Sequence, residues 1–284
     1  MRLLKALFAA AVPALAAAAG AIWFLAPPSP GDVMLDPNDI PTSPLDSISA
    51  ADREALGRRR IYFGHKSVGN DVLDGVRGLL SERKDLPLSI RSGLSGPAGA
   101  PGLCESTVGE NRDPLAKIRD FAANLRAAGP GAVDVAVLKF CFVDVTASTD
   151  TAALFAAYEE AISSLRKELP GTVFVHSTVP LTALGNTFKA RVKRILGRDR
   201  DPADNARREE FNARIRSAFA GREPIFDIAR AESTLPDGER VTCRAMGRDV
   251  PCMARGYTTD GGHLNAAGKR AAAVEFLRAL AESK

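Results

Sequence analysis

An acidic residue stands three positions before a histidine near the C-terminal end of the chain, in Asp260-Gly261-Gly262-His263. A carboxylate at this spacing can fold back onto one imidazole nitrogen and fix the tautomer of the ring. The other ring nitrogen is then free to take a proton from a hydroxyl group. The pattern therefore predicts the base of a serine hydrolase, with His263 as the base and Asp260 as the residue that orients it.

The hydroxyl group for this base is expected at the end of an early strand, and Ser67 fits that position. An apolar run over 60–63 predicts a short strand, and the apolar spacing from Val68 onward predicts a helix. The first amides of such a helix can stabilise an oxyanion on the substrate. A serine at this spot is by itself most often a helix N-cap. Its combination with His263 in this chain order favours the nucleophile.

Strand and helix patterns alternate along the chain after about residue 50. The predicted strands cover residues 60–63, 86–90, 133–145, 172–179 and 224–228. Such alternation predicts an α/β fold with a doubly wound parallel sheet. Because ligands bind at the carboxyl ends of the strands in these sheets, we expect Ser67, Asp144, His176 and the Asp260–His263 pair to gather at that edge.

The chain resembles the SGNH (GDSL-like) hydrolases over roughly residues 60–281, and most closely in Asp260-Gly-Gly-His-Leu-Asn-Ala-Ala-Gly268. The resemblance implies a flavodoxin-like three-layer α/β/α sandwich with a central, mostly parallel five-stranded sheet. It also implies a triad in which Ser67 is the nucleophile, His263 the base and Asp260 its orienter. No metal ion or organic cofactor is implied.

The family is characterised by a few short sequence segments, or blocks, and two of them differ in this chain. Where the family has Gly-Asp-Ser, this chain has Gly64-His65-Lys66-Ser67, and Cys141-Phe142-Val143-Asp144 lacks the usual glycine and asparagine of the third block. Gly109 is the candidate for the oxyanion-hole glycine, and Asn70 or Asn111 is a hypothetical substitute for the missing asparagine. Losing one oxyanion donor costs about 10²–10³ in rate.

The N-terminus predicts a targeting segment. Arg2 and Lys5 are followed by an uncharged stretch over 6–26, which is long enough to span a bilayer at about 20 residues. A cleaved signal peptide and an uncleaved membrane anchor both remain open for residues 1–26. Residues 27–49 are predicted as a Pro-rich linker, and 50–284 as the hydrolase-like domain. Either alternative exports the domain, to the periplasm or the outside of the cell.

The charge distribution disfavours one class of function, and the cysteine content predicts disulfides. The net charge is +4, and the positive charge is concentrated between residues 189 and 200, which disfavours a nucleic-acid-binding domain. An even number of cysteines in an exported chain suggests disulfides. Cys243 and Cys252 lie in one loop and are the favoured pair, and Cys104 with Cys141 follows by elimination. The spacings match no zinc motif.

Three further polar residues fall in or beside predicted strands. His65 and His176 are each expected to pack or bond locally, although His65 could also contact substrate or act as a rival base. Lys139 lies inside the most apolar strand. A buried ammonium group without a partner is costly. We therefore expect Lys139 to pair with Asp144 or Asp134.

These patterns favour hydrolysis or transfer of an ester, with a small acyl group such as acetyl on an envelope or extracellular glycan or lipid. A deacetylase and an acetyl transferase both fall within this prediction. Two alternatives remain open at this stage. One is a catalytically degenerate domain that binds a glycan, and the other is a membrane-tethered scaffold for a partner protein.

Overall fold

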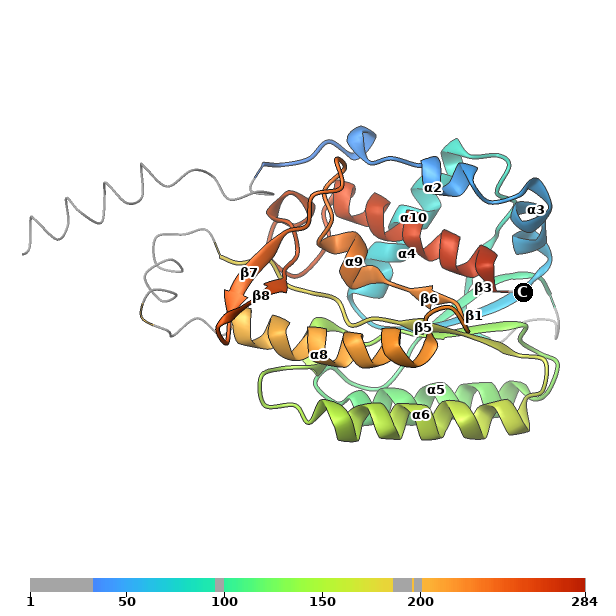
Figure 1. The fold of residues 1–284 in the computed structure, drawn as a ribbon. Coiled ribbons are helices and arrows are strands. Elements are labelled where there is room, and N and C mark those ends of the chain that lie inside the picture. The colour runs from blue at the N-terminus through green and yellow to red at the C-terminus, as the bar shows by residue number, and fades with distance from the viewer. Residues whose placement is uncertain (1–32, 95–99, 186–195, 197–200, 284) are drawn as a thin grey trace, which may run out of the picture.

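The computed structural model describes residues 33–94, 100–185, 196 and 201–283. Its centre is a six-stranded parallel sheet with the strand order β2-β3-β1-β4-β5-β6 (Figure 1). The strands are β1 (Arg60–His65), β2 (Ile90–Ser92), β3 (Gly102–Thr107), β4 (Val135–Leu138), β5 (Val173–Ser177) and β6 (Ile225–Phe226). A separate hairpin consists of β7 (Thr242–Ala245) and β8 (Arg248–Pro251).

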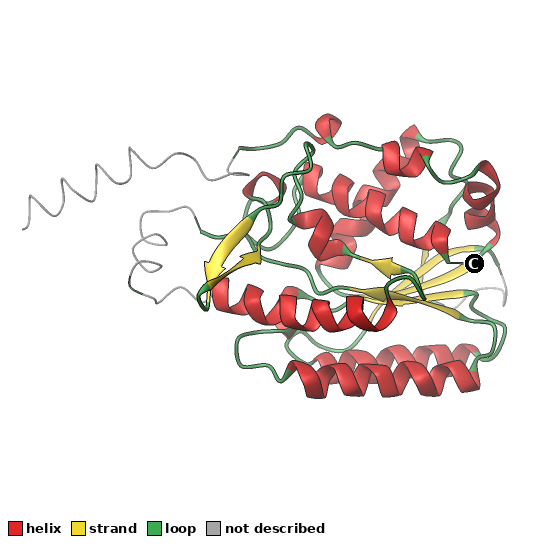
Figure 2. Ribbon diagram, viewed as in Figure 1, coloured by secondary structure: helices red, strands yellow, loops and turns green. Residues whose placement is uncertain are grey.

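Helices cover both faces of the sheet, which gives the predicted three-layer α/β/α sandwich (Figure 2). One face is covered by α5 (Pro114–Ala128), α6 (Thr151–Glu168) and α8 (Asp201–Phe219). The other face is covered by α3 (Ala50–Arg58), α4 (Val68–Glu82), α9 (Ile228–Glu232) and α10 (Ala266–Glu282).

Alternating side chains of the central strands divide the core in two. In β1, Ile61 and Phe63 are buried on the side of α4 and α10, whereas Tyr62 is buried on the side of α5. In β4, Val135 and Val137 are buried on the same side as Ile61 and Phe63. This two-sided burial explains why the central strands are nearly continuous apolar runs in the sequence.

Six strands form where five were predicted, because β3 lies in a Gly- and Pro-rich stretch between residues 92 and 113, for which no strand was predicted. β3 begins at a glycine with a φ of 121° and ends in polar residues. The predicted strand over 133–145 is also wrong in length. β4 ends at Leu138, and the chain continues through buried residues into the 3₁₀ helix Phe142–Asp144.

Part of the Pro-rich stretch before the domain packs against it. Ile40 and Leu45 are buried in the same core as α10, and Leu45 lies in the short helix α2 (Ser43–Asp46). The predicted targeting segment, residues 6–26, lies outside the described residues. Among the helices of the described residues, none has the length and apolar character that a bilayer crossing needs.

One predicted disulfide is confirmed and the other is wrong. Cys243 and Cys252 are bonded across the β7–β8 hairpin. Cys104 and Cys141 are both buried free thiols. Cys104 lies in β3 and Cys141 follows β4, with β1 between them. Two strand spacings amount to about 10 Å, which exceeds the separation that a disulfide can bridge.

Leu45 is expected to stabilise the domain although it precedes the first helix of the sandwich. Because its side chain is fully buried, Leu45→Ala should lower the free energy of unfolding by about 2–5 kcal/mol. Urea denaturation would measure this loss. The matched control is Leu115→Ala, whose side chain is 45% exposed and whose effect should stay within about 0.5 kcal/mol. Equal effects would show that the segment does not contribute to the core.

Candidate active site

The structure brings Ser67, His263 and Asp260 into one hydrogen-bonded chain at the carboxyl edge of the sheet. The Ser67 Oγ lies 2.6 Å from His263 Nε2. On the other side of the ring, His263 Nδ1 lies 2.7 Å from Asp260 Oδ2. With Nδ1 bonded to the carboxylate, Nε2 is the nitrogen that can accept the serine proton. The arrangement is therefore competent for nucleophilic catalysis by a hydroxyl group.

The Asp260 carboxylate is held by its own loop. Its Oδ1 accepts hydrogen bonds of 2.8 Å from the backbone N–H groups of Gly262 and His263. Burial alone would raise the pKa of the Asp260 carboxyl, but the hydrogen bonds from Gly262 and from the His263 ring and backbone outweigh burial. They hold the pKa well below its usual range. Asp260 is therefore a carboxylate at any pH near neutrality and can stabilise an imidazolium.

Ser67 occupies a strained position between β1 and α4. Its φ of 48° and ψ of −104° place it at the second position of a type II′ turn, which the hydrogen bond from Gly69 N–H to Lys66 O closes at 3.0 Å. This conformation favours glycine and costs other residues of order 1–3 kcal/mol. The side chain makes no cap hydrogen bond. Ser67 is thus not the side-chain N-cap that its position alone favours, and its hydroxyl points to His263 instead.

An aromatic wall stands beside the histidine. The Phe142 ring meets the His263 ring edge-on, with centroids 5.8 Å apart. Gly262 lies against the same ring, where a Cβ atom would come within 2.6 Å of Phe142. The buried Arg208 fixes the wall from behind by donating to Phe142 O at 2.9 Å and Val145 O at 3.1 Å. Sequence reasoning named Phe142 only as part of the altered third block and gave it no role, and it missed Arg208, which belongs to no recognisable motif.

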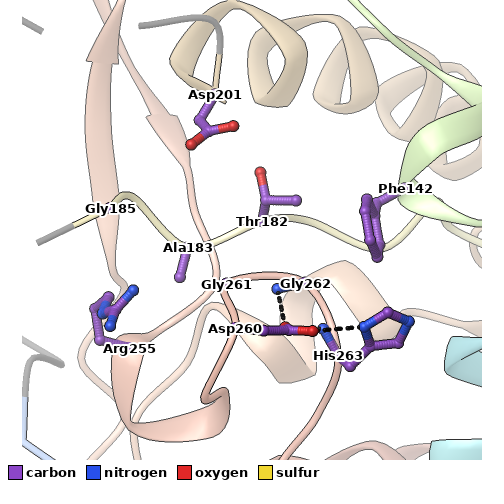
Figure 3. A pocket seen from close by; sticks show the side chains of 10 residues that line it. All are labelled: Phe142, Thr182, Ala183, Gly185, Asp201, Arg255, Asp260, Gly261, Gly262 and His263. Carbon is purple, nitrogen blue, oxygen red and sulfur yellow. Dashed lines mark hydrogen bonds and ion pairs between the residues drawn. The ribbon is translucent and has the colours of Figure 1, made fainter. Parts of the chain in front are cut away.

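A cavity of about 270 Å³ opens beside the Asp260–His263 pair. Figure 3 shows Phe142 and His263 at one end of it and Arg255 at the other. The remaining wall is largely polar or backbone, and it is formed by Thr182, Ala183, Gly185, Asp201, Gly261 and Gly262. A wall of this kind offers polar side chains and backbone groups to a ligand.

The proposed oxyanion donors have different surroundings. The Gly109 N–H donates to Asp120 Oδ2 at 2.8 Å, so this amide would have to break that bond to serve an oxyanion. Asn70 is exposed in the first turn of α4. The exposed Asn111 follows β3, and its Oδ1 accepts from Lys117 Nζ at 3.1 Å.

Both other histidines have local partners. His176 is bonded to Tyr158 through Nδ1 and to Glu223 through Nε2, and it stacks on Phe219. It lies in the core under α6 and α8, so the expectation that it joins the edge cluster is wrong. His65 is buried and bonded to Glu105 at 3.1 Å. Burial and the charge of Lys139 lower the pKa of His65 to about 4, which keeps the ring neutral.

The expected ion pair of Lys139 is also wrong. Asp144 is bonded to Lys117 at 2.5 Å, and Asp134 to Arg60 at 2.9 Å. The buried Lys139 ammonium instead donates to Phe140 O at 3.1 Å. In the described part of the chain, no group of three or more His, Cys, Asp or Glu side chains is arranged to hold a metal ion.

Glu232 is a buried acid that sequence reasoning missed. Its Oε2 accepts from Leu181 N–H at 2.7 Å, which anchors the chain just before the Thr182–Ala183 wall of the cavity. Burial raises the pKa of the Glu232 carboxyl to about 8, although the Leu181 N–H and the charge of Lys139 lower it. The carboxyl is therefore predominantly protonated at neutral pH.

No protein-family model matches the chain, and no curated protein does. Among solved structures, the chain is similar to a GDSL-like lipase from Bacteroides thetaiotaomicron VPI-5482, with 15% identity, coverage of 81% of this chain and 94% of the lipase, and a TM-score of 0.48. It is also similar to the periplasmic domain of a lipopolysaccharide acetyltransferase from Salmonella ser. Paratyphi A, with 11% identity, coverage of 81% and 85%, and a TM-score of 0.43.

What the site can do chemically is decided by the side chains of this chain. The decisive geometry is the contact of Ser67 with His263.

The strained backbone at Ser67 predicts that glycine at this position makes the fold more stable than alanine does. Ser67→Gly should be more stable than Ser67→Ala by about 1 kcal/mol, because glycine adopts a positive φ without a Cβ penalty. Both variants lack the hydroxyl, so the comparison isolates the backbone. Thermal and urea unfolding would measure the difference, and equal stability of the two variants would contradict a strained turn.

The raised pKa of Glu232 predicts a pH-dependent stability. A carboxyl with a folded pKa of about 8 and an ordinary value of 4.5 contributes its full stability below the ordinary value and loses it as the pH rises through 8. Glu232→Gln stays neutral, so it should gain a few kcal/mol over the wild type between about pH 5 and about pH 9. Urea unfolding at both pH values measures this, with the exposed Glu159→Gln as the control. A variant-to-wild-type difference that is constant with pH would refute the assignment.

Proposed function

We propose that the chain is an SGNH-type serine ester hydrolase or acyl transferase. The observation that carries this proposal is the hydrogen-bonded chain from Ser67 through His263 to Asp260, with distances of 2.6 and 2.7 Å. Three residues in this geometry can supply the nucleophile, the base and the orienting carboxylate of acyl transfer. Ser67 and His263 touch the reacting atoms, and Asp260 acts through the ring of His263.

In the first step, His263 Nε2 takes the proton of Ser67 Oγ while this oxygen attacks the acyl carbon of the ester. The electron pair of the carbonyl moves to its oxygen, and a tetrahedral intermediate forms. His263 then gives its proton to the alcohol as the C–O bond of the ester breaks. The alcohol leaves, and the acyl group remains on Ser67. The ionised Asp260 stabilises the imidazolium throughout.

The oxyanion needs donors on the opposite side from His263. Ser67 stands immediately before the N-terminus of α4, where amides point away from the helix. No hydrogen bond joins the Ser67 amide to another described residue. We assign this amide as one donor. Because this amide and the nucleophilic Oγ belong to the same residue, the distance between them changes little when Ser67 moves.

In the second step, the acyl group passes to water or to another alcohol. The His263 side chain is 49% exposed and that of Asp260 54% exposed, so the base is open to a large acceptor. This openness fits an ester carried on a glycan or a lipid surface better than a small ester that must be enclosed. The neighbouring cavity with Arg255 and Thr182 would receive the polar part of the substrate.

The location that we propose follows from the N-terminal sequence. Residues 1–26 serve as a signal peptide or a membrane anchor, and the domain acts in the periplasm or outside the cell. The acyl donors and acceptors there are envelope or extracellular glycans and lipids. A small acyl group such as acetyl is the substrate class that this reasoning favours.

Hydrolysis of p-nitrophenyl acetate by the full-length chain tests the chemistry. Ser67→Ala and His263→Ala should each lower kcat/KM by about 10³-fold or more, because each removes a proton-transfer partner. The matched control is Ser81→Ala, which removes an exposed hydroxyl from the far end of α4 and should keep wild-type activity.

Covalent labelling adds a readout that does not depend on turnover. A fluorophosphonate probe should add its mass to the peptide that contains Ser67 in the wild type, and should not label His263→Ala at the same rate. Activity that survives in both triad variants would refute this chemistry. A folded wild type without activity or labelling would instead favour the alternative of a glycan-binding domain.

A further inference from the structure

The cavity beside the Asp260–His263 pair ends at a positively charged side chain. Figure 3 shows Phe142 and His263 at one end of the cavity and the Arg255 side chain at the other. The volume of about 270 Å³ is close to the lower end of the range for small-molecule sites, about 300–1,000 Å³. One small unit that carries an ester can therefore extend from the base of the proposed triad to the guanidinium group of Arg255.

The loop that carries this side chain is tied down on two sides. Arg255 begins the 3₁₀ helix η3 (Arg255–Tyr257), and the N–H of the preceding Ala254 donates to Glu232 O at 2.8 Å. Asn265 Nδ2 donates to Gly256 O at 2.8 Å. Glu232 is the last residue of α9, and Asn265 is the N-cap of α10. The backbone that presents Arg255 to the cavity is therefore fixed by two helix ends.

Other hydrogen-bond donors of the cavity wall are already bonded within the protein. Five backbone amides of the wall donate to neighbouring oxygens at 2.8–3.0 Å, namely those of Thr182, Ala183, Gly261, Gly262 and His263. The Thr182 hydroxyl donates to Asn205 Oδ1 at 3.2 Å. These groups shape the wall, but each of them has its hydrogen in use.

Arg255 differs from these groups because it has donors to spare. A guanidinium group has five N–H donors and no acceptor. Within the described part of the chain, its only hydrogen bond runs from Nη1 to Leu184 O at 3.3 Å, and no carboxylate pairs with it. The side chain is half-buried. The ligand that best matches this planar, charged fork presents two anionic oxygens, as a carboxylate or a phosphate does.

The charges around the cavity also favour an anion. Two acids line it, but Asp260 is bonded to His263, and Asp201 is close enough to the buried Arg208 for their charges to attract. Between Gly185 and Asp201, which both line the cavity, the sequence contains six basic residues and one acidic residue. A positive balance of this kind raises the local concentration of anionic substrates.

We propose that Arg255 determines the specificity of this site, and that the substrate is an acyl ester on a small unit that also carries a carboxylate or a phosphate. This inference rests on the proposed esterase function and deepens it, because it names the substrate class. The guanidinium group binds the anion at one end of the cavity while the ester lies at Ser67 and His263. A uronic acid would supply the carboxylate, and a sugar phosphate would supply the phosphate. Because the contact is the same in the bound substrate and in the transition state, it acts mainly on KM.

Three aryl acetates of similar size test this specificity with the full-length chain. Two are anionic, 4-acetoxybenzoate and 4-acetoxyphenyl phosphate, and the third is the neutral methyl 4-acetoxybenzoate. The quantity measured is the ratio of kcat/KM for each anionic ester to that for the neutral ester. Comparing this ratio between variants and wild type cancels differences between the leaving groups. The anionic ester with the larger dependence on Arg255 identifies carboxylate or phosphate as the ligand.

Arg255→Met should lower the ratio for at least one anionic ester by about 10–100-fold, mainly through KM, because it removes a charge-assisted contact. Arg255→Lys keeps the charge without the fork and should retain part of the preference. Arg255→Glu should make the anionic esters poorer substrates than in Arg255→Met. The matched control is Arg244→Met, which removes an exposed arginine from β7 and should leave the ratio at its wild-type value. If Arg255→Met does not fold, the lysine and glutamate variants decide the question.

Binding gives a readout that does not depend on turnover. In Ser67→Ala, calorimetry with the same two anionic esters should show a Kd that rises about 10–100-fold when Arg255→Met is added. Ratios and Kd values that do not change with residue 255, in a wild type whose hydrolysis needs Ser67, would overturn only this inference. Hydrolysis that survives Ser67→Ala at the wild-type rate would overturn the proposed function, whatever the variants of Arg255 show.

Discussion

The contact between Ser67 Oγ and His263 Nε2 joins residues 196 positions apart in the chain at 2.6 Å, and the rest of the site depends on it. A hydrogen bond of this kind tolerates errors of only a few tenths of an ångström. Two elements must therefore be held in register, namely α4 behind Ser67 and the loop before α10. The fold meets this requirement by packing α4 and α10 directly against each other on one face of the sheet.

The packing of α4 on α10 is unusually close because small residues allow it. A Cβ atom at Gly75 would lie 2.1 Å from Lys269 O, so only glycine permits this approach of the backbones. Asp71 of α4 then reaches the loop that carries Asp260 and His263 and accepts from Leu264 N–H at 3.1 Å. Lys269 pairs with Asp74 at 2.9 Å. The two proposed catalytic residues are thus linked through backbone and side chain, and not only through their own contact.

Buried charge surrounds the site without entering it. Lys117 and Asp144 neutralise each other under the loop after β3, and the raised pKa of Glu232 leaves a neutral acid under the cavity wall. By contrast, Asp260 is ionised and lies close to the surface. The negative charge that a developing imidazolium needs is therefore available at the ring. The groups below it serve to fix loops, since they bind each other, backbone N–H groups and the Asn111 side chain.

The sequence by itself determined the features that depend on neighbours in the chain. The pairing of Asp260 with His263 spans three residues, the Cys243–Cys252 disulfide spans nine, and the alternation of apolar runs fixed the layers. Only the tertiary structure decided that Ser67 adopts a strained turn, that Asp120 occupies the Gly109 amide and that Lys117, not Lys139, pairs with Asp144. The reason is physical: a local pattern sets which conformations a segment can adopt, but strand order and packing choose which distant groups meet in the interior.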